Sequence, residues 1–236
     1  RDVTFAYEEG KNILENVSFT VKPGESIALV GPTGAGKTTI VNLLSRFYDL
    51  TGGAVYIDGN DISKVTLHSL REKMGIMMQD SFIFSGTIED NIRYGKLDAT
   101  EEEIRAAAKT VCADEFIMGL ENGYKTEMYE GGSQLSGGQR QLVSFARTLI
   151  SDPKILILDE ATSSVDTRTE IQIQKAMDNL MKGRTSFVIA HRLSTIKDAD
   201  LILVLKDGDI IEQGNHEELI AKNGFYAELY NSQFDS

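Results

Sequence analysis

A glycine-rich segment between an apolar run and an amphipathic stretch limits the fold of this 236-residue chain more than any other feature. Residues Gly31-Pro32-Thr33-Gly34-Ala35-Gly36-Lys37-Thr38 fit the pattern G-x-x-x-x-G-K-[ST]. The strand-like run 26–30 precedes them, and apolar residues follow at helical spacing over 38–47. Glycines let backbone N–H groups turn toward phosphate oxygens, and a helix N-terminus adds positive potential. The segment predicts a phosphate-binding loop in which Lys37 meets the β- and γ-phosphates and Thr38 ligates Mg²⁺.

Strand and helix signals alternate along the rest of the chain. Apolar runs at 155–158, 186–190 and 201–205 are typical of strands buried in a parallel sheet, and residues 173–181 carry a helical stripe. The run 54–57 followed by Asp58-Gly59-Asn60 indicates antiparallel strands early in the chain. No comparable buried strand occurs between residues 87 and 150, which favours a separate helical lobe. The pattern predicts an α/β fold with a parallel sheet and crossover connections.

Two carboxylates, Asp159 and Glu160, directly follow the apolar run 155–158. The carboxyl end of a buried parallel strand lies at the sheet edge where α/β proteins bind ligands. We therefore expect Asp159 to hold Mg²⁺, through water, and Glu160 to accept a proton from an attacking water molecule. Acids at the end of a strand are common, but a neighbouring phosphate loop makes the functional interpretation the stronger one.

A second glycine-containing motif, Leu135-Ser136-Gly137-Gly138-Gln139, opens a predicted helix. Ser136 and Gln139 form the pattern of a capping box, and a helix start with two glycines is also an anion site. With this motif the sequence resembles the ATP-binding cassette (ABC) ATPases, in particular the nucleotide-binding domain of exporter-type ABC transporters of the multidrug or lipid exporter kind. The resemblance covers essentially the whole chain.

The resemblance implies a P-loop NTPase (RecA-like) core with a parallel sheet, an N-terminal antiparallel β subdomain and a helical subdomain. The chain is then one ABC ATPase domain, residues 1–236. Residues 1–86 and 151–236 form the α/β core with the β subdomain, and residues 87–150 form the helical subdomain that carries the signature motif.

Two such domains meet head to tail in this family, so the resemblance implies that a second, identical or homologous domain is a partner. Each ATP then lies between the phosphate loop of one domain, extended to Thr39, and residues 136–139 (Ser136, Gly137, Gly138 and Gln139) of the other. Tyr7 matches the aromatic residue that stacks on adenine. Asp166 matches the loop that crosses to the partner.

The resemblance also assigns catalytic roles that complement Glu160. Gln79 matches the glutamine that reaches Mg²⁺ and the attacking water, and His191 matches the switch histidine that contacts the γ-phosphate. The implied cofactors are ATP and Mg²⁺. The implied function is an ATPase, a translocase, that couples ATP-driven dimerisation and hydrolysis to export of a substrate across a membrane.

The exporter subtype depends on residues 80–95 and on the loop 127–134, which resembles the exporter loop that touches the coupling helices. Tyr129 replaces the usual glycine there, Gly131 stands where a larger polar residue is common, and Glu130 is kept. The chain starts at Arg1 without a methionine, so we expect it to be a piece of a longer polypeptide. Transmembrane domains are then expected before it in the same chain. The fragment itself is expected to be soluble, at the cytoplasmic face of the membrane.

Composition excludes several other classes. With 24 Lys+Arg and 36 Asp+Glu the net charge is −12, which argues against nucleic acid as a partner. No apolar run approaches the roughly 18 residues that a membrane span needs. One cysteine, Cys112, forms no internal disulfide, and its Ala-rich helical context predicts a small packed hydrophobe.

Two alternatives stay open at this point: the ATP-binding half of a heterodimeric exporter with only one working site, and an importer-type ABC ATPase. Soluble ABC ATPases of DNA repair or translation are disfavoured by the compact spacing of the two motifs and by the acidic charge. A GTPase is disfavoured because no Asn-Lys-x-Asp motif occurs.

Other polar residues have structural interpretations. Thr100 and Glu103 predict a capping box, which explains the acidic cluster 101–103 without a metal. His68 is expected on a surface helix, and His216 is expected to open the C-terminal helix.

Overall fold

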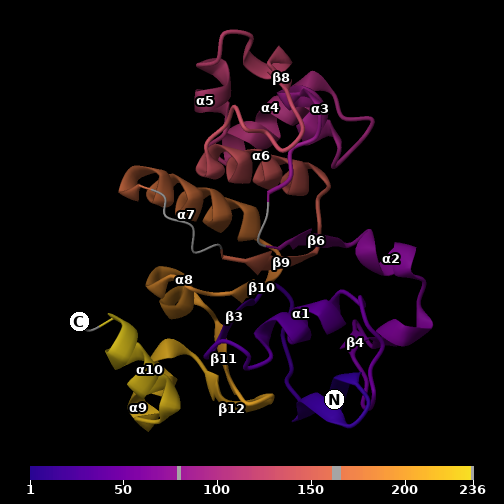
Figure 1. Cartoon of the computed structure of the whole chain (residues 1–236), viewed down its shortest axis with the longest axis vertical. Helices are drawn as coiled ribbons and strands as arrows, with labels where there is room; N and C mark the ends of the chain where they lie inside the picture. The colour runs from indigo at the N-terminus through magenta and orange to yellow at the C-terminus, as the bar shows by residue number, and fades with distance from the viewer. Residues whose placement is uncertain (79–80, 161–165, 235–236) are drawn as a thin grey trace. The chain divides into compact units, whose positions relative to one another are not determined.

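The computed structural model describes residues 1–78, 81–160 and 166–234, and its chain divides into two compact units (Figure 1). Unit 1 consists of residues 1–74, 155–160 and 184–236, and unit 2 of residues 75–154 and 161–183. Contacts thus group the helix at 167–181 with the helical unit, whereas the sequence assigned that stretch to the α/β core.

The core of unit 1 is a largely parallel sheet around β3 (Ser26–Val30). β10 (Thr185–Ile189) and β11 (Leu201–Lys206) pair with it in parallel, one on each side. β9 (Ile155–Asp159) continues the sheet beyond β10, and β12 (Asp209–Gly214) closes the other edge in antiparallel pairing with β11. Most residues of the central strands are buried, and Val, Ile and Leu predominate among them, as expected for strands covered on both faces. The predicted α/β class is confirmed.

The remaining strands of unit 1 are antiparallel and lie before residue 62. β1 (Val3–Glu8) pairs with β2 (Lys11–Val17), and β4 (Tyr56–Ile57) pairs with β5 (Asn60–Asp61). Asp58 and Gly59 join the second pair with φ of 49° and 78°, the two left-handed positions that a type I′ hairpin turn requires. β4 covers only the last two residues of the strand predicted at 54–57.

Helices flank the sheets of unit 1. They are α1 (Lys37–Leu44), the 3₁₀ turn η1 (Ile62–Lys64), α2 (Leu67–Arg71), α8 (Leu193–Asp198), α9 (His216–Lys222) and α10 (Phe225–Phe234). His68 lies exposed on α2, as predicted. His216 is the first residue of α9, but α10 follows it, so His216 does not open the C-terminal helix as predicted.

Unit 2 is built around α6 (Gly137–Ile150), which contacts α3, α4 and α7 (Figure 1). Its elements are β6 (Met74–Met77), β7 (Gly86–Thr87), α3 (Ile88–Arg93), α4 (Glu101–Thr110), α5 (Asp114–Met118), η2 (Gly123–Lys125), β8 (Glu127–Met128) and α7 (Thr167–Met181). Arg147 of α6 donates to the carbonyls of Asn91 and Phe82, at 2.8 and 2.9 Å. This guanidinium fixes the entry to α3 against the central helix.

The capping boxes predicted from sequence are present. Thr100 accepts from the N–H of Glu103 at the start of α4, and Ser136 accepts from that of Gln139 at the start of α6, with the reciprocal bonds also formed. The helical context expected for Cys112 was wrong, because the residue lies in the turn after α4 with φ +60°, where it is half-buried. In the described part of the chain, no helix has the length and apolar character needed to cross a membrane.

Candidate functional site

The glycine-rich loop joins β3 to α1, and at two of its glycines a side chain would collide with neighbouring atoms. A Cβ on Gly31 would lie 2.2 Å from the carbonyl oxygen of Leu205, and Gly36 has φ +108° with a Cβ position 2.8 Å from Leu14. Gly36 is also the N-cap of α1, and no side chain caps that helix. The N–H groups of its first turn therefore face outward from a positive helix end, which is the arrangement that binds phosphate.

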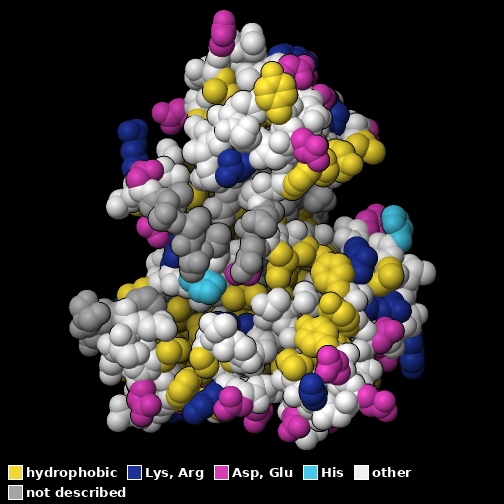
Figure 2. All heavy atoms as spheres, in the orientation of Figure 1, with side chains coloured by type: hydrophobic (Ala, Val, Ile, Leu, Met, Phe, Trp, Pro, Cys, Tyr) yellow, Lys and Arg dark blue, Asp and Glu magenta, His cyan; other side chains and the backbone are white. Residues whose placement is uncertain are grey.

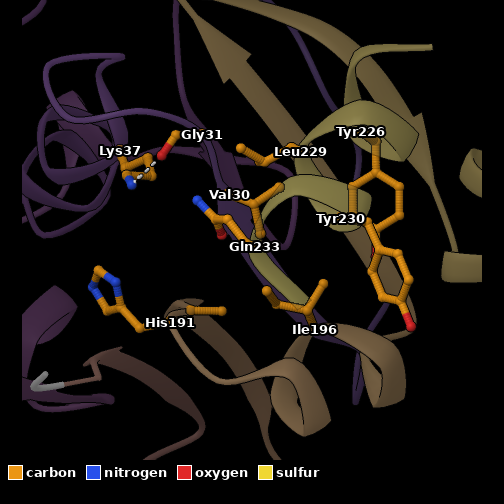
Figure 3. Close-up of a pocket in the computed structure, with 10 residues that line it drawn as sticks. Val30, Gly31, Lys37, His191, Ile196, Tyr226, Leu229, Tyr230 and Gln233 are labelled. Carbon is orange, nitrogen blue, oxygen red and sulfur yellow. Dashed lines mark hydrogen bonds between the residues drawn. The ribbon is translucent and has the colours of Figure 1, made fainter. Parts of the chain in front are cut away.

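Lys37 is the first residue of α1, and its ammonium is half-buried. It donates to the carbonyl oxygen of Gly31 at 2.5 Å, as Figure 3 shows. Burial lowers the pKa of Lys37, and the negative charge of Asp159 partly opposes that shift. An anion that approaches the loop therefore stabilises the charged form of this partly desolvated lysine.

A small cavity of about 80 Å³ adjoins Lys37 and His191 (Figure 3). Its far wall is the C-terminal helix α10, through Tyr226, Leu229 and Tyr230. This volume accommodates two or three water molecules and not a nucleotide. α10 thus lies next to the phosphate loop, a contact that no sequence motif indicates.

Asp159 ends β9 with its side chain only 4% exposed. Its Oδ1 has no hydrogen-bond partner among the described residues, and the closest charged group recorded for it is Nε2 of His191 at 3.6 Å. A buried carboxylate oxygen without a partner is costly, and it is a natural ligand for a hard divalent cation. Asp159 thus fits Mg²⁺. No group of three or more His, Cys, Asp and Glu that could hold a metal by itself occurs anywhere in the described ranges, this site included.

Glu160 is 3% exposed and is held by the segment that begins α8. Its Oε2 accepts from the N–H groups of His191 and Arg192, at 2.7 and 3.0 Å. Its Oε1 accepts from the hydroxyl of Thr195. The sequence predicted the carboxylate but not these three donors, because Thr195 is 35 residues away in the chain and carries no motif of its own.

Tyr7 lies on β1 with 48% of its surface exposed. Its hydroxyl is 3.2 Å from the Oγ1 of Thr39, a buried residue of α1. The residue predicted to stack on adenine is therefore linked directly to the helix that carries Lys37 and Thr38. Thr38 is exposed at the first turn of that helix.

The signature residues belong to unit 2, where Gly137 and Gly138 differ in their surroundings. A Cβ on Gly138 would lie 2.4 Å from the Cγ2 of Thr169 on α7, whereas one on Gly137 would meet nothing closer than the Arg140 guanidinium at 3.7 Å. Gly138 thus permits the close approach of α6 and α7, and Gly137 leaves the helix start open to a ligand.

The other predicted residues are placed as follows. Asp166 caps α7 and accepts from the N–H and hydroxyl of Thr169, at 3.0 and 2.6 Å, and these bonds lower its pKa. Gln79 lies outside the described residues. Tyr7, residues 31–39, Asp159, Glu160 and His191 come together in unit 1, and residues 136–139 and Asp166 belong to unit 2.

Comparison with known proteins agrees with this geometry. The family model described as ABC transporter matches residues 14–163. The chain is 57% identical over 235 residues to the uncharacterized ABC transporter ATP-binding protein YfiC of Bacillus subtilis, covering 100% of this chain and 39% of that protein. It is 51% identical over 227 residues to a fatty acid ABC transporter ATP-binding/permease protein of Mycobacterium bovis, covering 96% of this chain and 36% of that protein.

A solved structure of a bacterial Atm1-family ABC exporter with ATP bound matches with a TM-score of 0.91 and 49% identity, covering 99% of this chain and 41% of that one. The chain therefore spans about two fifths of the length of the proteins it matches. The family match covers more than half of the chain, and the resemblance first seen in its motifs is confirmed: the chain belongs to the ABC transporter family and is similar to the ATP-binding domains of its exporters.

Proposed function

We propose that the chain binds ATP and Mg²⁺ and hydrolyses ATP as the motor domain of an exporter-type ABC transporter. The observation that carries the proposal is the grouping in unit 1 of an uncapped helix start, a half-buried lysine and a buried pair of carboxylates. Phosphoryl transfer needs mainly positioning and charge stabilisation, and these groups supply both.

Each residue has a distinct role in this proposal. The first-turn N–H groups of α1 and the Lys37 ammonium bind the phosphates, and the ring of Tyr7 supports the adenine. Thr38 and Asp159 hold Mg²⁺, with Gln79 as a further ligand. When bound, Mg²⁺ neutralises charge on the β- and γ-phosphates. His191 contacts the γ-phosphate and orients it.

Glu160 accepts the proton of the attacking water in this proposal. Both of its oxygens already accept hydrogen bonds from residues 191–195. These donors fix the orientation of the carboxylate. Oε2 accepts two of the bonds and Oε1 accepts one, so Oε1 keeps a lone pair that can accept a bond from the attacking water. The start of α8 thus orients the general base, and the backbone of the neighbouring His191 is bonded directly to it.

The assembly is also part of the proposal. Residues 136–139 and Asp166 of a second domain, identical or homologous, complete each ATP site in a head-to-tail dimer, with the helical subdomain at residues 87–150 carrying the signature. Transmembrane domains encoded in the same longer chain carry the substrate, and the motor works at the cytoplasmic face. Support comes from the relative whose name joins ATP-binding to permease and from the share of those proteins that this chain covers.

The test is the solution mass of the Glu160→Gln chain with Mg-ATP, compared with Mg-ADP. A slowed site keeps ATP bound, so we expect a dimer with ATP and a monomer with ADP. Adding Lys37→Ala to the same variant removes the phosphate-binding cation and should abolish the ATP-dependent dimer. A monomer in ATP, with ATP demonstrably bound, contradicts a self-sufficient homodimer and indicates a different partner domain.

A further inference from the structure

The aromatic residue Tyr48 lies beside Tyr7 although no motif marks it. The ring centroids of Tyr7 and Tyr48 are 5.0 Å apart with an interplanar angle of 87°. Phe5, which is 3% exposed, meets the ring of Tyr7 at 4.7 Å and 86°. Two rings at right angles therefore hold Tyr7, and edge-to-face pairs of this kind are directional.

The segment that carries Tyr48 is held in place by two arginines. Arg46 has φ +54° and donates to the carbonyls of Ile62 and Val65, at 3.0 and 2.6 Å. Arg71 donates to the carbonyl of Arg46 at 3.1 Å, and its guanidinium lies 4.8 Å from the ring centroid of Phe47. The chain from the end of α1 to Tyr48 thus has a fixed course.

Hydrogen bonds also tie the residues after Tyr48 to the strand of Tyr7. Thr4 exchanges backbone bonds with Gly52, both at 3.0 Å, and accepts from the N–H of Thr51 at 3.1 Å. The N–H of Ala6, next to Tyr7, donates to the Oγ1 of Thr51 at 3.3 Å. The two tyrosines are therefore carried by segments that are bonded to each other.

Both rings nevertheless stay available at the surface. Tyr7 is 48% and Tyr48 is 46% exposed, and Figure 2 shows hydrophobic side chains gathered over α1 and β4 in this unit. A half-exposed ring that is fixed in angle, and whose hydroxyl lies 3.2 Å from Thr39 of the phosphate-binding helix, is suited to stack on a planar base at a set distance from the phosphates.

We propose that Tyr48 is a positioning residue for the base of the bound nucleotide, because Tyr48 holds the ring of Tyr7 at its stacking angle. The inference rests on the proposed function, since it takes Tyr7 as the residue that stacks on adenine. Tyr48 raises the affinity for a purine nucleoside triphosphate through the contact that Tyr7 makes with the purine base. The contacts to the phosphates do not depend on Tyr48.

The test compares the binding of ATP and of inorganic tripolyphosphate, which has no base, to Tyr48→Leu, Tyr48→Phe and the wild type by calorimetry. An edge-to-face pair is worth enough to change affinity about two- to tenfold. We expect Tyr48→Leu to weaken ATP by that factor and to bind tripolyphosphate as the wild type does, while Tyr48→Phe, which keeps the ring, stays close to the wild type. KM for ATP rises and kcat does not change.

Tyr56→Leu is the matched control, because Tyr56 is a tyrosine of the same unit, 49% exposed, that contacts Arg1 and not Tyr7. Equal losses for ATP and tripolyphosphate, or unchanged ATP affinity in Tyr48→Leu, overturn the proposal. Tyr7→Leu distinguishes failure of the role of Tyr48 from failure of the adenine site itself. If it weakens ATP and Tyr48→Leu does not, only the role of Tyr48 fails, and if Tyr7→Leu has no effect, the assignment of the adenine site fails as well.

Discussion

Nε2 of His191 lies 3.6 Å from Oδ1 of Asp159, the buried carboxylate oxygen that lacks a hydrogen-bond partner among the described residues. The imidazole attracts this oxygen only when it is protonated, whereas Mg²⁺ carries two positive charges at any pH. The metal is thus the better partner for Asp159. In the proposed site, Mg²⁺ on Asp159 would leave the imidazole of His191 to contact another anion, which is the role proposed for it.

The first prediction concerns Asp159→Asn in the absence and presence of Mg²⁺. In EDTA the variant should unfold at a higher temperature than the wild type, because a buried charge is removed. The loss of attraction to Lys37 opposes this effect, so we expect the free energy of unfolding to rise by up to about 2 kcal/mol. With Mg-ATP the order should reverse, since the wild type gains binding energy that the variant lacks. Asp152→Asn, an exposed acid at 71%, is the control. A variant less stable than the wild type in EDTA would show that the partnerless Oδ1 of Asp159 carries no net cost.

The second prediction concerns the hydroxyl that Thr195 donates to Glu160. Both residues are buried, at 8% and 3% exposure. Thr195→Val keeps the shape and removes the donor, so stability should fall by roughly 1–3 kcal/mol and kcat should fall with little change in KM. Thr195→Ser keeps the hydroxyl and should restore both. Thermal melts and steady-state ATPase rates check this, and wild-type kcat in the valine variant would show that the bond does not position the general base.

Much of the fold was predictable because its signals are local. The phosphate loop, the buried strands and the capping boxes each occupy a few adjacent residues whose spacing is fixed by backbone geometry. Cys112 was misplaced because an Ala-rich stretch suits a continuing helix, whereas the chain turns there with a left-handed residue. The pair β7–β8 has two residues in each strand, too few to show an alternating pattern.

The residues that the sequence missed at the site depend on distant contacts. Thr195 reaches Glu160 across 35 positions, and Tyr48 reaches Tyr7 through a loop fixed by Arg46 and Arg71. No local pattern specifies either meeting. The two signature glycines look alike in the sequence, and only the position of α7 separates their roles.

The third prediction is a pH dependence that arises from His216. Burial, with a smaller contribution from the charge of Lys197, lowers the pKa of His216, and Glu217 partly opposes this. Its Nδ1 is 2.8 Å from the hydroxyl of Tyr226, whose pKa is raised to about 12 mainly by burial, so that hydroxyl stays neutral.

Because the folded pKa of His216 is lower than the unfolded one, the unfolded chain takes up the proton first as pH falls. Stability from this residue is therefore fully present above the unfolded pKa of about 6.5 and is lost as pH falls toward the lower, folded pKa. Melting temperatures between pH 7.5 and 5 should fall less steeply for His216→Gln than for His68→Gln, the exposed histidine of α2. Equal slopes for the two variants would count against a lowered pKa.

The fourth prediction separates the two glycines of the signature. Gly138→Ala places a methyl group 2.4 Å from the Cγ2 of Thr169, and overpacking costs about 1–3 kcal/mol. The better helix propensity of alanine returns about 1 kcal/mol, so we expect a net loss of up to about 2 kcal/mol in unfolding free energy. Gly137→Ala meets no such contact and should be as stable as the wild type or slightly more stable, yet lose ATPase activity, because the open helix start faces the ligand in the proposed dimer.

A second substitution tests the cause of the Gly138 effect. Thr169→Ser removes the Cγ2 methyl and keeps the hydroxyl that bonds to Asp166. In the double variant the steric conflict disappears, so stability should return to that of Thr169→Ser alone or slightly above it. Additive losses in this double-mutant cycle, measured by chemical denaturation, would mean that Gly138 matters for a reason other than the packing of α6 against α7. Coupling between the two substitutions, together with a stable but inactive Gly137→Ala, assigns packing to one glycine and ligand approach to the other.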